Sequence, residues 1–289
     1  MTTCTAWSIA CGGDDMEAMT ARQQFDADGF YIARNLLDAG VVDVCAQDIH
    51  AVFAQQVALL GLPDAGDLFG NARALHGAHI EQFKKVLAAL WRLQSVGALL
   101  NAAPIMAVLK KVFGFGPVFV PGGQTVHVQS AELKIPGGYF GLKAHQDWPS
   151  VQGSLDGLGV WVALCAIDAN AYPLEVVPGS HRRGLIAPAG NQTSGLWVVD
   201  ALDDAAFVPV CVKPGDVVFF SNFLVHRSGL AGRSDFVRIA CSTRFDNGGE
   251  PSFVARGLPS AYTRAVQREL MDFADVDAVN RSLPGGIAD

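Results

Sequence analysis

The chain has 289 residues, of which 50% are hydrophobic and 17% are charged, so it can bury a sizeable core and lacks the composition of a disordered protein. Its formal charge of −7 disfavours non-specific binding to nucleic acid, which needs an electropositive surface, and gives little support for binding to an anionic membrane. We therefore expect a small-molecule substrate or ligand, with no nucleic acid and no membrane as partner. The oligomeric state is left open.

The elements predicted for the first half of the chain are mostly helical. Residues 1–20 are expected to form an irregular lead-in, and residues 25–34 a turn that leads into a short strand. Apolar residues at helical spacing predict helices over 39–60 and 80–100, and a third helix over 104–113. Glycine and proline directly after the first of these helices, and glycine after the last, are typical of helix ends.

The character of the sequence changes after Gly116. Short β-branched or aromatic runs follow, separated by Gly, Pro, Asn and Asp, which is the pattern of an antiparallel sandwich or barrel. These runs cover residues 118–120, 125–135, 159–167, 174–177, 208–212, 216–221 and 236–245. Helical spacing returns over residues 258–274.

These patterns predict one domain over residues 1–289, mainly β with flanking helices. A helical N-terminal part (about 1–115) precedes a core of about eight strands (about 116–246), and a C-terminal helical segment (about 255–289) follows. We expect the core to be a double-stranded β-helix, the jelly roll of cupin-like proteins. Such a fold places ligand-binding side chains on strand ends at one mouth of the barrel.

The cysteines and the first residues of the chain indicate in which cellular compartment the protein is located. Six cysteines, none in C-x-x-C spacing, are typical in so long a chain of reduced, mostly buried thiols rather than of a zinc ribbon or a disulfide framework. The first residues show no basic stretch followed by an apolar run, as a secretory signal would, and the longest apolar run, about 157–167, is too short to cross a bilayer. We therefore expect a cytoplasmic protein.

The most informative motif is the triplet His145-Gln146-Asp147, which His226 follows 79 positions later (226 − 147) at the end of an apolar run. Residues i and i+2 of a strand point to the same side, so His145 and Asp147 can share a metal ion. Two imidazoles and one carboxylate are the ligands that a non-haem Fe(II) site uses on one face of its octahedron, with the opposite face open. The triplet alone is common by chance. The second histidine in a β-rich context gives it weight.

An arginine follows in a similar context. Arg238 lies 12 positions beyond His226 (238 − 226), inside the apolar run Phe236-Val237-Arg238-Ile239-Ala240. Burial of such an arginine is costly unless it meets an anion, and a guanidinium suits a carboxylate. A structural ion pair is the alternative interpretation of Arg238.

With these residues the chain resembles the phytanoyl-CoA dioxygenase (PhyH)-like family of Fe(II)/2-oxoglutarate-dependent oxygenases, from about Phe25 to Phe245. The resemblance is carried by the helical opening after Gly29-Phe30, the His145-Gln146-Asp147 triplet, the segment Leu174-Glu175-Val176-Val177-Pro178-Gly179-Ser180-His181, the strand ending in His226, and Arg238. Asn170-Ala171-Tyr172-Pro173 replaces the Asn-Gly that the family often has before the Pro-Gly-Ser-His segment. This departure concerns a loop at the mouth rather than the iron site.

The resemblance implies a set of ligands. His145, Asp147 and His226 would bind Fe(II), and Arg238, assisted by Ser228, would pair with the far carboxylate of 2-oxoglutarate. An aspartate in the triplet favours hydroxylation over halogenation, because related halogenases have a small residue at that position.

Further residues are candidates for the pocket. Gln146 and Trp161 are similar to family positions that line the cosubstrate and substrate pocket, and Lys134, on the strand before the triplet, is a further candidate for the cosubstrate. Trp148 is expected to contact the substrate, or else to pack at the barrel rim. His127 alternates with its neighbours on a predicted strand and is a second candidate substrate contact inside the barrel.

The activity that this resemblance implies is hydroxylation of an aliphatic C–H bond of a small metabolite or biosynthetic intermediate. Fe(II), 2-oxoglutarate and O2 would be required, and succinate and CO2 released. Two alternatives stay open: a cupin-like metalloenzyme that does not use 2-oxoglutarate, and a non-catalytic small-molecule binding protein on the same scaffold. Succinate production would distinguish the first alternative. The substrate is left open, as is the choice between hydroxylation and desaturation or cyclisation.

Overall fold

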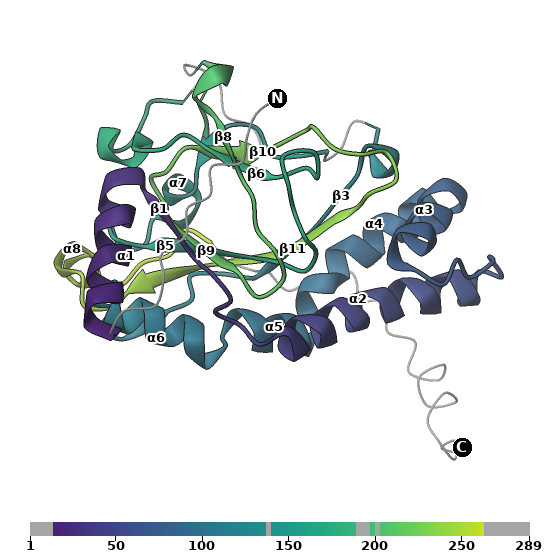
Figure 1. The fold of residues 1–289 in the computed structure, drawn as a ribbon, viewed down its shortest axis with the longest axis horizontal. Helices are drawn as coiled ribbons and strands as arrows, with labels where there is room; N and C mark the ends of the chain where they lie inside the picture. The colour runs from purple at the N-terminus through teal and green to yellow at the C-terminus, as the bar shows by residue number, and fades with distance from the viewer. Residues whose placement is uncertain (1–13, 137–139, 189–196, 200–202, 263–289) are drawn as a thin grey trace, which may run out of the picture.

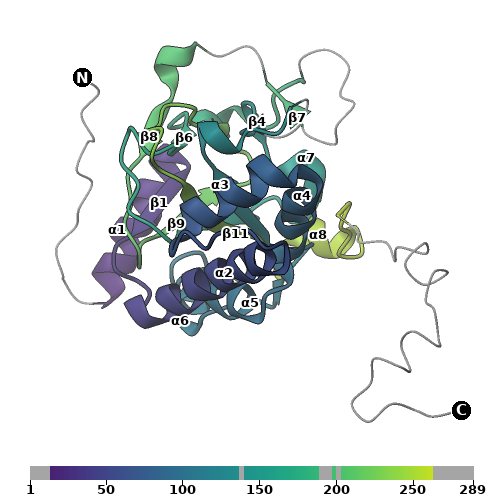
Figure 2. The ribbon, with the colours of Figure 1, turned by 90° about the vertical axis from the view of Figure 1, so that its right-hand side faces the viewer.

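In the computed structural model, which describes residues 14–136, 140–188, 197–199 and 203–262, two antiparallel sheets lie one above the other and helices cover the outer face of the larger sheet (Figure 1, Figure 2). The six-stranded sheet has the order β1-β9-β5-β11-β2, with β3 also paired to β11. The five-stranded sheet has the order β7-β4-β10-β6-β8. This is the jelly-roll arrangement, and the predicted fold class is confirmed.

The two sheets differ in strand length. The larger sheet contains β1 (Phe30–Ala33), β2 (Val118–Phe119), β3 (Thr125–Gln129), β5 (Leu158–Ala163), β9 (Val217–Ser221) and β11 (Arg238–Asn247). The smaller sheet contains β4 (His145–Gln146), β6 (Leu174–Val176), β7 (Trp197–Val198), β8 (Val208–Val210) and β10 (His226–Ser228). The described residues thus hold more strands than expected, because runs of two or three residues carry too little periodicity to be predicted.

The helices come mainly from the first half of the chain. They are α1 (Asp14–Asp28), α2 (Ala39–Leu59), α3 (Leu68–Ala78), α4 (Ile80–Ala89), α5 (Gln94–Leu100), α6 (Ala103–Lys111), α7 (Trp148–Val151) and α8 (Pro251–Ala255). Four 3-10 turns accompany them in the described residues: η1 (Leu90–Arg92), η2 (Ala131–Leu133), η3 (Ser180–Arg183) and η4 (Asp204–Ala206). The helices α2, α5 and α6 lie beneath the larger sheet in the view of Figure 1.

Two inner strands of the larger sheet, β5 and β9, are buried on both faces and consist almost entirely of apolar residues. On β5, Val160 and Val162 pack in the cluster shared with the helices, together with Phe219 of β9. The neighbouring residue Trp161 belongs to a second cluster on the other face, together with Phe220. This second face looks into the space between the two sheets, where the site described below is found.

The N-terminal half corrects three predictions. Residues 14–20 belong to α1, which continues to Asp28, so the turn comes at Gly29 (φ 82°) rather than at residue 25. The helix expected over 80–100 is interrupted at Leu93, whose backbone is extended (φ −58°, ψ 131°). The helix α3 lies between two predicted helices, in a segment for which no helix was predicted; the Asp67 side chain accepts a hydrogen bond from the Gly70 amide at 2.7 Å and caps its start.

The helices expected over 39–60 and 104–113 are confirmed as α2 and α6. The strand β1 comes from the predicted helical part and pairs with β9 at the edge of the larger sheet. A helix over 258–274 is wrong for residues 258–262, which form bends and irregular backbone, and the rest of that range lies outside the described residues.

Two other expectations can be compared with the structure. Cys45, Cys165 and Cys241 are free thiols, as expected, but Cys211 is disulfide-bonded, so the expectation of reduced cysteines is wrong there. No single helix among the described residues has the length and apolar composition needed to cross a bilayer; one bent helix pair, Ile80–Arg92 with Gln94–Lys111, meets that test by length and composition alone.

Candidate metal centre

The three predicted ligands meet at one place in the structure. His145 of β4 and His226 of β10 are direct partners across two antiparallel strands, and their ring centroids lie 4.1 Å apart. Asp147 follows β4 and has helical dihedral angles (φ −79°, ψ −32°) at the start of α7, so a turn, not strand alternation, brings it beside the histidines. One ligand atom from each of the three buried residues lies within 4.8 Å of the others. This set fits a metal ion held by two imidazoles and a carboxylate.

Backbone carbonyls fix the orientation of both imidazoles. Nδ1 of His145 lies 2.6 Å from the carbonyl oxygen of Lys143, and Nδ1 of His226 lies 3.0 Å from that of Leu224. With the proton assigned to Nδ1, each ring turns Nε2 toward Asp147, at 3.6 Å from Oδ1 for His145 and 3.9 Å from Oδ2 for His226. Nε2 of His145 is buried and has no hydrogen-bond partner. A buried, unpartnered ring nitrogen of this kind is the observation that a metal ion would explain.

The protonation states also suit a metal site. Burial lowers the pKa of His226 to about 3, with a further contribution from His145, so the ring is neutral at pH 7. Burial alone would raise the pKa of Asp147, but the charge of Arg244, the nearby His226 and the hydrogen bonds from His145 and Arg244 together outweigh it and hold that pKa well below its usual range. Metal ligands must be deprotonated, as the His226 ring and the Asp147 carboxylate are at pH 7.

Arg244 was not among the predicted site residues. Its Nε donates to Oδ2 of Asp147 at 2.9 Å, and its Nη2 donates to Oδ1 at 2.8 Å. The sequence contains one signal for it. Arg244 lies on the same strand as Arg238 at an even spacing, so both side chains point to the same face of β11.

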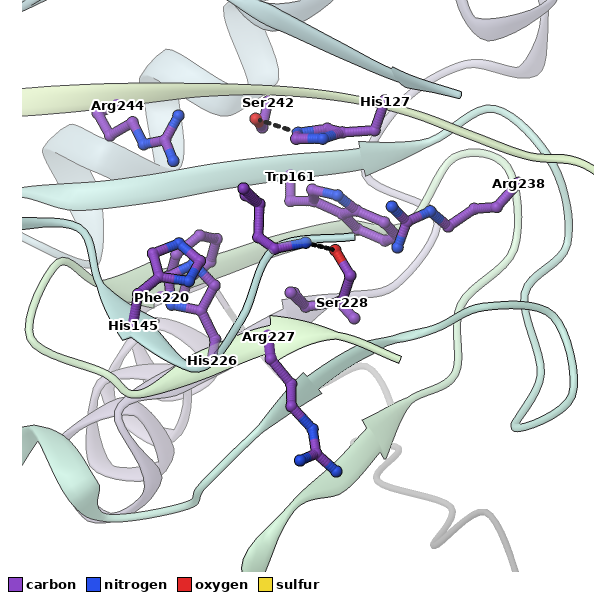
Figure 3. Close-up of a pocket in the computed structure, with 12 residues that line it drawn as sticks. His127, His145, Trp161, Phe220, His226, Arg227, Ser228, Arg238, Ser242 and Arg244 are labelled. Carbon is purple, nitrogen blue, oxygen red and sulfur yellow. Dashed lines mark hydrogen bonds between the residues drawn. The ribbon is translucent and has the colours of Figure 1, made fainter. Parts of the chain in front are cut away.

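The metal ligands lie at one end of a cavity between the sheets (Figure 3). The residues that line it are His127, Leu142, His145, Trp161, Leu174, Phe220, His226, Arg227, Ser228, Arg238, Ser242 and Arg244. Four of the predicted pocket residues, His127, Trp161, Ser228 and Arg238, are thus brought together with two of the predicted metal ligands.

Arg238 is 2% exposed and lies on the far side of Trp161 from the histidines (Figure 3). Its Nη1 donates to the carbonyl oxygen of Tyr172 at 2.8 Å, and its guanidinium lies 5.9 Å from the centre of the Trp161 ring. Ser228 accepts a hydrogen bond from the Leu142 amide at 3.1 Å. A buried cation with a hydroxyl on the facing sheet is suited to a carboxylate.

His127 and Gln129 share one face of β3. Nε2 of His127 lies 2.9 Å from Oγ of Ser242, and burial, followed by the charge of Arg238, lowers the pKa of His127 to about 3. Gln129 stands directly across from Arg238 in the sheet register and is 2% exposed, with its Oε1 lacking a partner. Alternation with His127 was the sequence signal for Gln129.

Three predicted pocket residues do not line this cavity. Gln146 is buried, but its Nε2 donates to the carbonyl oxygens of Gly184 and Phe223 at 2.8 and 2.7 Å. Lys134 is exposed and follows η2, so it does not lie on a strand before the triplet. Trp148 stacks on Phe223, with ring centroids 5.5 Å apart, which agrees with the alternative that it packs at the barrel rim.

Known proteins resemble this chain in sequence, in fold and through a family model. One curated relative, methylphosphonate hydroxylase of Gimesia maris, is 31% identical over 103 residues, which cover 36% of this chain and 38% of that protein. The 1-deoxypentalenic acid 11-beta-hydroxylase of Streptomyces exfoliatus is 23% identical over 256 residues, 85% of this chain and 84% of the relative. The chain spans well under half the length of the first of these relatives.

A solved structure with the same fold is the epimerase SnoN in complex with Fe3+, alpha-ketoglutarate and nogalamycin RO. It has a TM-score of 0.55 and 18% sequence identity, with 88% of this chain and 98% of the other covered. The family model described as Phytanoyl-CoA dioxygenase (PhyH) matches residues 25–240. Since that match includes both sheets up to β11 and more than half of the chain, the protein belongs to the phytanoyl-CoA dioxygenase family.

Proposed function

We propose that this protein is an Fe(II)/2-oxoglutarate-dependent dioxygenase that hydroxylates an aliphatic C–H bond of a small metabolite or biosynthetic intermediate, with release of succinate and CO2. One observation carries the proposal: the buried ligand atoms of His145, Asp147 and His226 lie within 4.8 Å of one another at the end of a cavity that also contains a buried arginine. Family membership supports the same activity.

The residues have separate tasks in this proposal. His145 and His226 would hold iron through Nε2, and Asp147 through its carboxylate. Iron, 2-oxoglutarate and O2 would supply the oxidising power. The protein contributes the neutral imidazole of His226 and the ionised carboxylate of Asp147 in a fixed arrangement, so neither has to lose a proton before iron binds.

Arg238 is the proposed anchor for the far carboxylate of 2-oxoglutarate. The Tyr172 carbonyl fixes the guanidinium against the Trp161 indole, so the arginine is already oriented before the cosubstrate arrives. Oγ of Ser228 accepts from the Leu142 amide, which leaves the hydroxyl hydrogen to donate to the same carboxylate. Leu142, Leu174 and Phe220 provide apolar walls that exclude water from the cavity.

The names of two relatives and the arginines of the cavity support an acidic substrate. The two relatives compared above are named for acids, methylphosphonate and 1-deoxypentalenic acid. Arg238 and Arg244 line the cavity, and a guanidinium is suited to a carboxylate or to a phosphate-like group. The proposed substrate therefore carries a carboxylate or a phosphonate.

The test is an anaerobic titration of the apo-protein with Fe(II) and then 2-oxoglutarate, followed by visible absorption. A weak charge-transfer band near ~500 nm is expected for 2-oxoglutarate bound to a facial-triad iron, and His226→Ala should remove it. The band would then justify a screen of small acids by succinate release. Bound iron without the band would favour the metalloenzyme that does not use 2-oxoglutarate, and no iron binding would favour the non-catalytic binding protein.

A further inference from the structure

The three proposed iron ligands differ in how the protein holds them. A neutral backbone carbonyl orients each histidine, whereas a charged side chain from the other sheet holds Asp147. That side chain is Arg244, 97 positions away in the sequence, which donates from Nε and Nη2 to both carboxylate oxygens at 2.9 and 2.8 Å. The contact therefore ties the end of β11 to the turn between β4 and α7.

Both partners of this ion pair are shielded from water. The Asp147 side chain is 2% exposed and the Arg244 side chain is 19% exposed. The two parallel hydrogen bonds fix the plane of the carboxylate as well as its position, since the guanidinium is a rigid fork. A lysine in the same place would supply charge but not this geometry.

The geometry restricts how Asp147 can bind a metal ion. Each carboxylate oxygen has two lone pairs. A guanidinium that bonds both oxygens side by side uses, on each of them, the syn lone pair, which is directed away from Cβ. A metal ion chelated by both oxygens needs those same two lone pairs. The Arg244 fork and two-oxygen chelation therefore exclude each other, and a metal ion shares Asp147 with Arg244 only through one oxygen.

We propose that Arg244 is a positioning residue that limits Asp147 to a one-oxygen bond with iron and so keeps a coordination position open. This inference rests on the proposed function. Opposite three protein ligands, an octahedral iron has three positions, of which 2-oxoglutarate takes two and leaves one for O2. A second bond from Asp147 would fill that last position.

The experiment replaces iron with Mn(II), whose bound waters are counted from the relaxation of water protons. The intact protein should lose about two exchangeable waters when 2-oxoglutarate is added and retain about one. In Arg244→Met, Asp147 is free to chelate, so the Mn(II) protein should start with about one water fewer and retain none after 2-oxoglutarate. Arg244→Lys should resemble Arg244→Met, because it restores the charge without the fork.

Arg34→Met is the matched control. Arg34 also holds a buried carboxylate, that of Asp216, with Nη1 at 2.8 Å from Oδ2, but neither residue lines the metal cavity. The control should lower thermal stability and leave the number of waters on Mn(II) unchanged. Thermal unfolding checks that each variant is folded, and Arg244→Gln, which keeps an amide donor, replaces Arg244→Met if the latter does not fold.

Three results would overturn the inference in different ways. Equal water counts in the intact protein and in folded Arg244→Met would remove Arg244 from this role. A folded Arg244→Met that binds no Mn(II) would show that the arginine is needed for ligation as such, not for one-oxygen coordination. If the intact protein itself bound no Mn(II), or if 2-oxoglutarate displaced no water from it, the proposed function would fail and the inference with it.

Discussion

The two sheets of this protein have different roles. In the larger sheet, β5 and β9 have six and five residues, and every one of them is buried. In the smaller sheet, strands of two or three residues carry the two histidines of the candidate metal centre. The long strands β5 and β9 bury apolar surface on both faces, whereas the short strands contribute to one cluster only, through Leu174, Val176 and Val210. The framework for stability and the presentation of ligands are therefore largely separate.

The separation is incomplete at β11. This strand belongs to the larger sheet, yet Arg238 and Arg244 point from it toward the cavity. The smaller sheet presents the metal ligands, and the larger one supplies the cations that act on the carboxylates. Substitutions on either side can show how far the two roles are independent.

The largest effect on the chemistry is expected from Asp147→Ala. With the only carboxylate of the triad gone, we expect loss of hydroxylation and of the charge-transfer band, because two imidazoles alone hold iron weakly. The variant should unfold at a lower temperature, because Arg244 loses its buried partner, so thermal unfolding must show that it is folded when activity is measured. Full activity in this variant would refute the assignment of the triad.

Phe219→Ala should show the reverse behaviour. Phe219 is fully buried between the larger sheet and the helices, so truncation removes apolar contacts and leaves a cavity that costs about 3–5 kcal/mol of unfolding free energy. Denaturant unfolding measures this loss. At temperatures where the variant stays folded, we expect the metal affinity to stay close to that of the intact protein; a large drop in affinity would show that the sheets are coupled.

Arg238→Ala should weaken 2-oxoglutarate binding roughly tenfold to a hundredfold, because a charge-assisted hydrogen-bond pair is lost. Titration of the charge-transfer band with 2-oxoglutarate measures the change, and iron affinity should be unaffected. Arg233→Ala is the control, since Arg233 pairs with Asp168 outside the cavity. Equal 2-oxoglutarate affinity in both variants would exclude Arg238 as the anchor.

Acid should destabilise the apo-protein through its buried histidines. The pKa values of His127 and His226 are about 3 in the folded protein, below the value of about 6.5 expected in the unfolded chain. Only the unfolded chain takes up protons between these values, so stability falls as the pH drops below 6.5. At pH 5 the loss is about 2 kcal/mol for each histidine. Unfolding of His127→Gln should be less sensitive to pH over this range, and an unchanged slope would contradict the buried neutral state.

The ligand set was predictable because each part of it can be recognised within a short stretch of sequence. A His-x-Asp triplet and a histidine at the end of an apolar run together indicate a metal site, and this indication does not depend on loop conformation. The arginine of the apolar run around Arg238 was predictable for a similar reason, since a buried cation among apolar residues needs an anion.

The remaining contacts depend on sheet register and on turns, which the sequence does not reveal. Arg244 lies 97 positions after Asp147 in the sequence and reaches it across the barrel. Gln146 follows His145 on a strand, so alternation points its amide away from the cavity, where backbone carbonyls hold it. Asp147 lies beside His145, as alternation predicts for i and i+2, but a turn into α7 at that residue brings it there instead of a continued strand.

The strand β10 is three residues long, and neighbouring side chains on it face opposite sides: His226 and Ser228 line the cavity, while the Arg227 side chain points away from them (Figure 3). On the outer side, Arg227 forms ion pairs with Glu175, its direct neighbour on β6, and with Asp204. A slip of β10 by one residue would break these ion pairs and would turn an arginine toward the metal in place of a histidine. The ion pairs on the outer surface thus stabilise the strand register that keeps the ligands on the inner surface.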